Sequence, residues 1–408
     1  MNHPPITRGR IVFAAAASFV FFQMVLQTFP SVMREGLVVD LSLNETGFGG
    51  LSSSFYYPYI ALQVPAGIAV ARFGARRVLI AGAALCTVAS FLFAMSQSAG
   101  SAEATRILMG LGAAPTVVCT MTLAAQWFPA RMFPLLAALT EMAGMTGGAL
   151  GQETLGYIVE HAGWRVAMLT CGVVSAILLT VIVVFVRNRA ATGAADANWP
   201  KISDLTGLLT SAPIAAATIA GGLVASAGVA FGMLWGVSYF QVCECMHLPA
   251  ASLSASFYFW GCLPGMLGFA WLCSRYGRPA LLLALGAVGT GVTMALILFV
   301  LHGQLAESIG MFALGVVNSS YVLAFSIVKD LVPKDLSGVA MGLTNMMIMG
   351  IGGLLFQQLI GVLAHHHGEG VPGAGPLSII IAAQVLALVI LAAGFLLKRD
   401  RPSGILAR

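Results

Sequence analysis

The chain repeats part of itself about halfway along its length, and this internal duplication constrains the fold more than any other feature. Ala71-Arg-Phe-Gly74 is echoed by Ser274-Arg-Tyr-Gly277, 203 residues later. Gly147–Gly156 aligns without gaps with Gly352–Gly361, at a spacing of 205 residues. Because these motifs recur in the same order at nearly the same spacing, the chain is predicted to consist of two related halves.

Composition indicates the environment in which these halves fold. Hydrophobic residues make up 59% of the chain and charged residues only 9%, whereas a soluble domain has about 25% charged residues. Such a chain cannot cover its exterior with charge, so the exterior is expected to face the lipid bilayer. The net charge of +5 does not indicate nucleic-acid binding, because no basic cluster is long enough to form a nucleic-acid-binding patch.

At about 20 apolar residues per crossing, the sequence predicts twelve transmembrane helices. They cover residues 11–37, 48–70, 77–98, 103–127, 134–158, 164–187, 212–243, 251–273, 279–301, 304–328, 336–364 and 376–397. The predicted fold is an all-α membrane protein with two six-helix bundles related by pseudo-two-fold symmetry. The N-terminal bundle is predicted at residues 1–187, a cytoplasmic linker at 188–211 and the C-terminal bundle at 212–408.

Lysine and arginine residues gather on one side of these predicted spans. Of the 20 in the chain, all except Arg34, Arg106 and Arg165 lie on the side of the N-terminus. The positive-inside rule therefore predicts that both termini are cytoplasmic. The short connections between the spans favour a plasma membrane of bacterial type, that is, an inner membrane.

Two short motifs resemble those of a known family. Gly67, Arg72, Gly74 and Arg76 match the family's motif between its second and third spans. Its fourth-span pattern is matched by Arg106, Gly110, Gly112, Ala113 and Ala114. The chain thus resembles the major facilitator superfamily of secondary transporters. This resemblance implies alternating access, with the substrate bound between the two halves near the middle of the membrane.

The resemblance also implies a cytoplasmic gate at the repeated basic turn. The predicted gate residues are Gly67, Arg72, Gly74, Arg76, Arg275 and Gly277. The family has an acidic residue where this chain has Ala71 and Ser274, so the latch between the halves is expected to be altered. The charged residues expected to compensate are Lys329, Asp330, Lys334 and Asp335.

Polar side chains inside the predicted spans indicate where a substrate would bind, because they are costly in lipid and usually face a cavity. Gln23, Gln27 and Arg34 lie within about 40° of one another around the first helix. Arg34 and Tyr56 lie near the outer ends of their predicted spans. For Arg34, extension to the membrane surface is as well supported as substrate binding. For Tyr56, the alternative to substrate binding is a role as an anchor at the membrane surface. The residues predicted to bind substrate are Gln23, Gln27, Arg34, Tyr56, Gln63, Thr120, Met145, Gln152, Tyr239, Asn318, Tyr321, Asn345 and Gln357.

Proton coupling is predicted for Arg106, Glu141 and Glu153. An arginine cannot lose its proton, so Arg106 needs an acid, a substrate anion or water, and an acid on the fifth span is the expected partner. Glu141 or Glu153 is predicted to carry a proton as access alternates. The alternative for Glu153 is a static ion pair with Arg106.

No metal or cofactor is predicted. Cys243 and Cys245 lack partners at zinc spacing, and His365–His367 are explained more simply as part of a solvated loop. No nucleotide-binding motif or catalytic triad occurs in a suitable context, so neither ATP use nor enzymatic activity is expected. The leading hypothesis is a monomer that takes up a small polar solute with protons, such as an amino acid, nucleoside or organic acid. The alternative is a proton antiporter that exports drugs or a secreted metabolite such as a siderophore.

Overall fold

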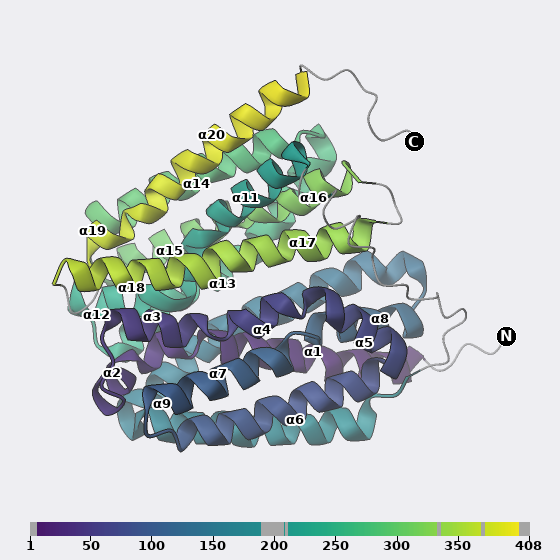
Figure 1. The fold of residues 1–408 in the computed structure, drawn as a ribbon, viewed down its shortest axis with the longest axis horizontal. Helices are drawn as coiled ribbons and strands as arrows, with labels where there is room; N and C mark the ends of the chain where they lie inside the picture. The colour runs from purple at the N-terminus through teal and green to yellow at the C-terminus, as the bar shows by residue number, and fades with distance from the viewer. Residues whose placement is uncertain (1–5, 189–207, 209–210, 333–335, 369–371, 400–408) are drawn as a thin grey trace.

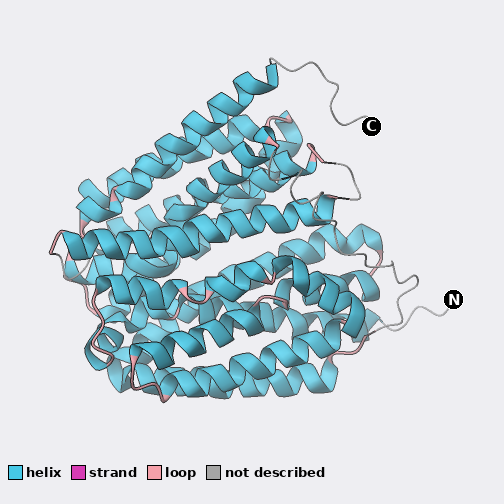
Figure 2. Ribbon diagram, viewed as in Figure 1, coloured by secondary structure: helices cyan, strands magenta, loops and turns pink. Residues whose placement is uncertain are grey.

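The computed structural model describes residues 6–188, 208, 211–332, 336–368 and 372–399, and within these residues it is helical, with no strand (Figure 2). The helices before residue 188 are α1 (Ile6–Thr28), α2 (Pro30–Asp40), α3 (Glu45–Ser53), α4 (Tyr56–Ala61), α5 (Gln63–Phe73), α6 (Ala75–Ala94), α7 (Ala99–Ala113), α8 (Thr116–Trp127), η1 (Ala130–Met132) and α9 (Phe133–Phe185). The helices after residue 211 are α11 (Ala212–Ser226), η2 (Ala227–Trp235), α12 (Gly236–Val242), α13 (Leu248–Tyr276), α14 (Pro279–Phe299), α15 (Gln304–Asn318), η3 (Ser319–Val322), α16 (Leu323–Lys329), α17 (Ser337–Met349), η4 (Gly350–Phe356), α18 (Gln357–His366), α19 (Ala374–Leu377) and α20 (Ile379–Arg399). This confirms the predicted all-α class.

The two groups of helices lie side by side, with the purple-to-blue helices below and the green-to-yellow helices above in Figure 1. In the first group α9 packs against both α1 and α6, and in the second α13 packs against α15 and α11 against α20. This arrangement agrees with the two halves expected from the repeat. The boundaries drawn at residues 187 and 211 remain a prediction, because most of the intervening segment lies outside the described residues.

Ten helices in the described residues are long and apolar enough to cross a membrane. One of them, Leu135–Phe185, contains a break at Gly163, where φ is 80° and ψ is 165°. The segment from α3 to α5 is not among the ten, because it is divided into three short helices. The count of twelve spans therefore remains a prediction, although these two features account for the difference.

Two prolines explain why the second predicted span is divided. A proline has no N–H group and cannot donate to the carbonyl four residues earlier. Pro58 thus leaves the carbonyl of Ser54 without its helical donor, and α3 ends at Ser53. Pro65 does the same to Ala61, which is the last residue of α4.

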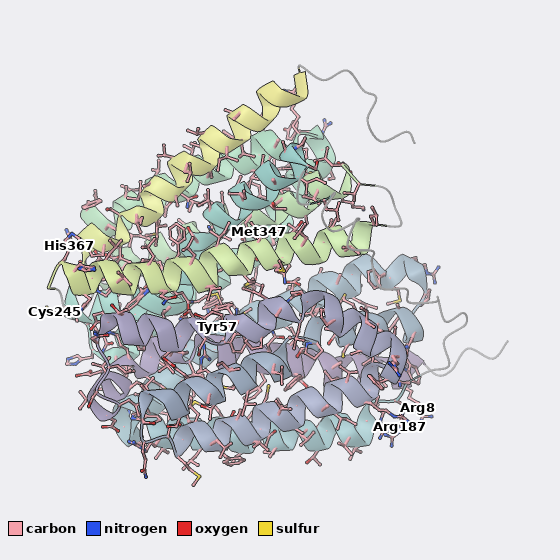
Figure 3. All side chains as sticks on the ribbon, in the orientation of Figure 1. Arg8, Tyr57, Arg187, Cys245, Met347 and His367 are labelled. Carbon is pink, nitrogen blue, oxygen red and sulfur yellow. The ribbon has the colours of Figure 1, made fainter. Side chains whose placement is uncertain are left out.

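The long helices run between two ends of the molecule, which we call the termini end and the far end. Arg8 and Arg187 lie at the termini end, whereas Cys245 and His367 lie at the far end (Figure 3). The positive-inside argument assigns the termini end to the cytoplasm. That assignment remains a prediction, because no membrane is present in the structure.

The two halves are in close contact toward the far end, where α3 packs along α18 and α9 packs along α13. Glycines allow this approach. A Cβ atom on Gly49 would lie 2.9 Å from the carbonyl oxygen of Gln357, and one on Gly361 would lie 2.5 Å from that of Glu45. Side chains at these positions would hold the halves apart, so the far end is closed by backbone-to-backbone packing.

Candidate transport site between the two halves

A hydrogen-bonded group of polar side chains joins the halves in the interior. The Gln27 amide donates to the Tyr56 hydroxyl at 3.1 Å and contacts the sulfur of Met349 at 3.9 Å. From the other half, the Gln357 amide donates to the same hydroxyl at 3.5 Å and to the Val229 carbonyl at 2.8 Å. Tyr56 is completely buried, so the structure corrects its alternative role as an anchor at the membrane surface.

A second polar group lies nearer the termini end. The Gln23 amide donates to the Tyr59 hydroxyl at 3.3 Å, and the Gln63 amide donates to the Tyr59 carbonyl at 3.3 Å. Glu141 on α9 is exposed and lies within electrostatic range of Tyr59 from one half and Tyr321 from the other. The Glu141 carboxyl group thus lies near side chains of both halves.

Gln152 also crosses between the halves but is closed off from solvent. Its amide nitrogen donates to the Ser31 hydroxyl at 3.2 Å and to the Gly232 carbonyl at 3.1 Å. Its side-chain oxygen is buried without a hydrogen-bond partner. Gln152 therefore fastens α9 to η2 in this state and leaves one acceptor available to a rearranged interface.

Arg106 does not pair with an acid. Its guanidinium donates to the Leu26 carbonyl at 2.6 Å and to the Ser52 carbonyl at 3.0 Å, and it is completely buried. The same group lies over the rings of Phe29 and Phe55, 4.8 and 5.0 Å from their centroids. Two carbonyl dipoles and two aromatic faces thus stabilise the charge.

Helix breaks supply those carbonyl groups. Pro30 begins α2 and cannot donate to the carbonyl of Leu26, four residues earlier. Ser52 lies in the last turn of α3, where carbonyl groups have no partner within the helix. Arg106 donates a hydrogen bond to the carbonyl group at each of these helix breaks. From the sequence, the expected partner of Arg106 is an acid, a substrate anion or water. Pro30 is the sequence signal that points to a backbone carbonyl group instead.

The remaining charged predictions also need correction. Glu153 is exposed and forms no ion pair with Arg106, so the predicted static pair is wrong. Arg34 does not lie with Gln23 and Gln27 in the central group. It pairs with Glu45 at 2.5 Å near the far end. Glu45 follows the N-cap residue Asn44 of α3, and this helix-start signal could have identified it as a buried partner.

Several predicted substrate residues pack within one half. Thr120 is buried and donates to the Thr116 carbonyl at 2.9 Å, which is a local helix contact. Tyr239 donates to the Leu298 carbonyl at 3.3 Å, and Asn318 donates to the Val224 carbonyl at 2.7 Å. The structure does not bring these three residues to the interface. Of the other predicted residues, Tyr321 and Asn345 are partly exposed and Met145 is buried.

The basic turn that was predicted as a gate is tied to its own half. The Arg76 guanidinium donates to the Val183 carbonyl at 3.0 Å, and its backbone N–H donates to the Asn188 side chain at 2.9 Å. Gly74 has a φ of 82°, which a glycine adopts without strain. Arg72 lies over the ring of Phe73. The turn is therefore held by a carbonyl group near the end of α9 and by the Asn188 side chain.

The second copy of the gate shows the same backbone turn. Gly277 ends α13 in the left-handed conformation, with a φ of 61°, and Arg275 lies over the ring of Tyr276. Among the described ion pairs none includes Lys329 or Asp330, and Lys334 and Asp335 lie outside the described residues. Gly67 has open space around its α-carbon.

Metal binding has no support in the described residues, which contain no group of three histidine, cysteine or acidic side chains placed to hold an ion. Cys243 and Cys245 are both exposed at the far end. The polar groups that remain are amides, hydroxyls and one carboxyl group. Amides and hydroxyl groups can form hydrogen bonds with a polar solute, and a carboxyl group can gain or lose a proton.

Comparison with known proteins identifies relatives of this chain. The sequence model of the Major Facilitator Superfamily matches residues 11–355. The chain is 27% identical over 150 residues to a putative inorganic phosphate cotransporter of Drosophila ananassae, covering 35% of this chain and 31% of that protein. It is 30% identical over 139 residues to the probable sulfoacetate transporter SauU of Cupriavidus necator, covering 33% and 32%. The matched segments thus span about a third of these relatives.

The fold has solved counterparts. A point mutant of the nucleoside transporter NupG superposes with a TM-score of 0.79 at 16% identity, and the match covers 96% of this chain and 99% of that one. At this identity the likeness shows the fold alone. The family model, in contrast, covers most of the sequence, and the chain belongs to the major facilitator superfamily of transporters.

Proposed function

We propose that the protein takes up a small polar organic solute together with protons, and that Glu141 carries the proton. The observation that supports this most directly is the position of Glu141. It is exposed between Tyr59 of one half and Tyr321 of the other, next to the amides that would hold a solute. Glu153 is exposed elsewhere on α9 and belongs to none of the ion pairs found among the described residues, which favours Glu141 as the carrier.

The proposed coupling follows from the cost of removing charge from water. Closing the termini end would enclose Glu141, and enclosing a carboxylate costs far more than enclosing a neutral carboxyl group. A proton on Glu141 therefore lowers the barrier to the closed intermediate. If the solute is an anion, the proton also removes the charge that would repel it. Proton and solute would then cross together.

The proposed site offers neutral hydrogen-bonding groups to the solute. Gln23, Gln63 and Asn345 present amides, while Tyr59 and Tyr321 present hydroxyl groups, and these residues lie nearer the termini end than the buried Gln27 group. Relatives named for phosphate and sulfoacetate transport make organic acids the first class to test. Nucleosides follow, because the structural neighbour NupG is named as a nucleoside transporter.

The test is transport by the purified protein in liposomes under an imposed pH gradient. Wild type should accumulate one of the tested solutes when the outside is acidic. Glu141→Gln should lose gradient-driven accumulation by about a hundredfold yet still exchange labelled for unlabelled solute, since a neutral amide mimics the protonated state. Glu153→Gln, a matched change on the same helix, should accumulate solute normally.

Three results would overturn the proposal. Full gradient-driven accumulation by Glu141→Gln would remove Glu141 as the carrier. Accumulation that requires an acidic interior in place of an acidic exterior would indicate export in exchange for protons. Loss of both accumulation and exchange in Glu141→Gln would assign the residue to solute binding and leave the proton carrier elsewhere.

A further inference from the structure

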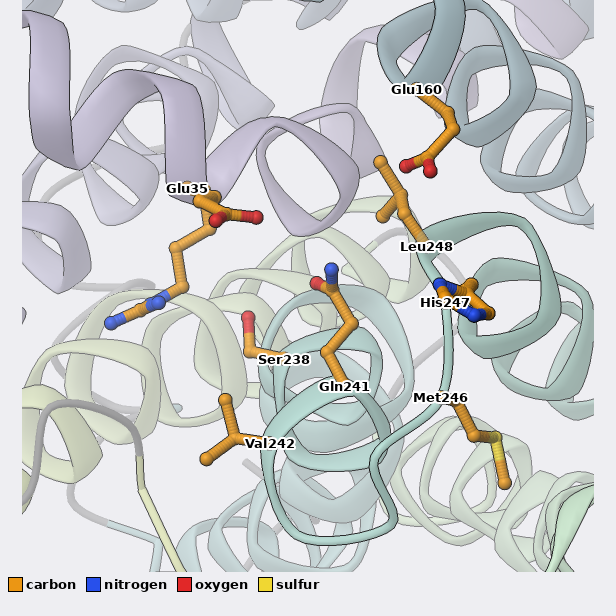
Figure 4. Close-up of a pocket in the computed structure, with 9 residues that line it drawn as sticks. Glu35, Glu160, Ser238, Gln241, Val242, Met246, His247 and Leu248 are labelled. Carbon is orange, nitrogen blue, oxygen red and sulfur yellow. The ribbon is translucent and has the colours of Figure 1, made fainter.

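A pocket of about 380 Å³ lies at the far end, outside the central polar groups. Its walls come from both halves (Figure 4). Glu35 on α2 and Glu160 on α9 belong to the first half, while Ser238 and Gln241 on α12 and the adjoining His247 belong to the second. A ligand in this pocket would therefore contact both halves while the far end is closed.

The pocket has an excess of negative charge. Arg34 also lines it, but Arg34 is already paired with Glu45 at 2.5 Å. Neither Glu35 nor Glu160 is a member of any ion pair among the described residues. Two carboxylates thus remain without a neutralising side chain, and this favours a cation.

Ser238 provides an independent sign that the pocket is built for a ligand. Its side chain is 1% exposed, and its hydroxyl oxygen is buried without a hydrogen-bond partner. Burying a hydroxyl group without a partner costs about 1–3 kcal/mol. Figure 4 shows Ser238 and Gln241 extending from α12 toward the elements that carry Glu35 and Glu160. A donor group on a ligand would satisfy the Ser238 oxygen.

We propose that this pocket binds a small organic cation with amino groups, and that the bound cation holds the far end closed. Ammonium groups can donate to the two carboxylates, the Ser238 hydroxyl and the Gln241 carbonyl together. Because the contributing groups come together only when the halves meet, the cation binds this state more tightly than an open one and shifts the population toward it. The pocket is separate from the proposed solute site.

The test is calorimetric titration of the full-length protein with 1,4-diaminobutane, with uncharged 1,4-butanediol as the isosteric comparison. Wild type should bind the diamine and not the diol. The double variant Glu35→Gln, Glu160→Gln should raise the Kd about tenfold or more, since charge-assisted hydrogen bonds are lost. Glu103→Gln removes a partly exposed carboxylate of α7 outside the pocket and should leave the Kd unchanged.

Transport assays separate this inference from the proposed function. The diamine should lower the maximum rate of solute exchange without changing the KM, and Ser238→Ala should weaken that inhibition. Equal binding by the double variant, equal binding of the diol, or a response to Mg²⁺ alone would overturn the proposal. None of these outcomes bears on Glu141, whose test depends on gradient-driven accumulation.

Discussion

At the scale of single residues, Arg106 shows how a buried charge is stabilised without a counter-charge. Its guanidinium bonds to the carbonyl groups of Leu26 and Ser52, each beside a helix interruption. The planar donor group can reach two acceptors in different directions, which a lysine cannot do as well. Arg106 is therefore expected to hold α1, α3 and α7 together, which would be a structural role.

Arg106→Gln should strongly destabilise the fold, because two buried carbonyl groups lose their donors. We expect the free energy of unfolding to fall by about 2–5 kcal/mol, measured by denaturation in mild detergent. Arg106→Lys should recover only part of this loss. Glu153→Gln should change the free energy of unfolding by less than about 0.5 kcal/mol. A large loss of stability in that variant would instead support an ion pair between Glu153 and Arg106.

Asp40 predicts a pH dependence of stability at the far end. Hydrogen bonds from Trp164 and then Arg165 hold the pKa of Asp40 below its usual value of 3.8. A lowered pKa in the folded state stabilises the fold fully above the unfolded pKa, and this contribution is lost as pH falls through the folded pKa. The effect is small, because the pair is exposed to solvent.

Thermal denaturation between about pH 6 and pH 3 checks this prediction through the variant Asp40→Asn. The difference in melting temperature between wild type and variant should be present at the upper end of this range and shrink toward the lower end. Added salt should reduce it. A difference that stays constant with pH would mean that the Asp40 charge does not contribute.

At the scale of helices, glycine placement determines how closely the halves approach. Gly49 and Gly50 are neighbours on α3 but have different surroundings. A Cβ on Gly49 would meet backbone atoms of α18, whereas one on Gly50 would meet nothing within 4 Å. Adjacent positions therefore separate the effect of the interface from the effect of glycine on the helix itself.

Gly49→Ala should loosen the far end, and Gly50→Ala should not. Alanine favours a helix over glycine by about 1 kcal/mol, so Gly50→Ala should leave the protein as stable or slightly more so. In Gly49→Ala the new methyl group forces α3 from α18. Hydrogen exchange of α3 and α18 should then become faster than in wild type. Equal protection in both variants would contradict a closed far end.

The sequence predicts the helices better than it predicts which groups the buried side chains bond to. Apolar runs and the repeat depend on local composition, and these predicted the all-helical fold and its two related groups. The different surroundings of Glu141 and Glu153 on α9 were also predictable from the sequence. A spacing of 12 residues places the two side chains about 120° apart around the helix. The partners of Arg106 were not predictable from hydropathy, because they depend on which carbonyl groups distant helix breaks expose.

At the scale of the whole molecule, the contacts between halves are unequal along the long axis. α3 with α18 and α9 with α13 close the far end, while Glu141 is exposed nearer the termini end. If the termini are cytoplasmic, as the distribution of basic residues predicts, these contacts close the outer side. Alternating access then requires α9 and α13 to separate at the far end.

A reversible cross-link between α9 and α13 tests that requirement. A Cβ on Gly156 would lie 2.6 Å from the Cβ of Ser252, so Gly156→Cys with Ser252→Cys needs the helices to part by about 1 Å to form a disulfide. Oxidation should stop solute exchange, and reduction should restore it to the level of the reduced double variant. Each single variant should be insensitive to oxidation. Continued exchange by the cross-linked protein would mean that α9 and α13 move together, and the far end would have to open elsewhere, with α3 and α18 as the next pair to cross-link.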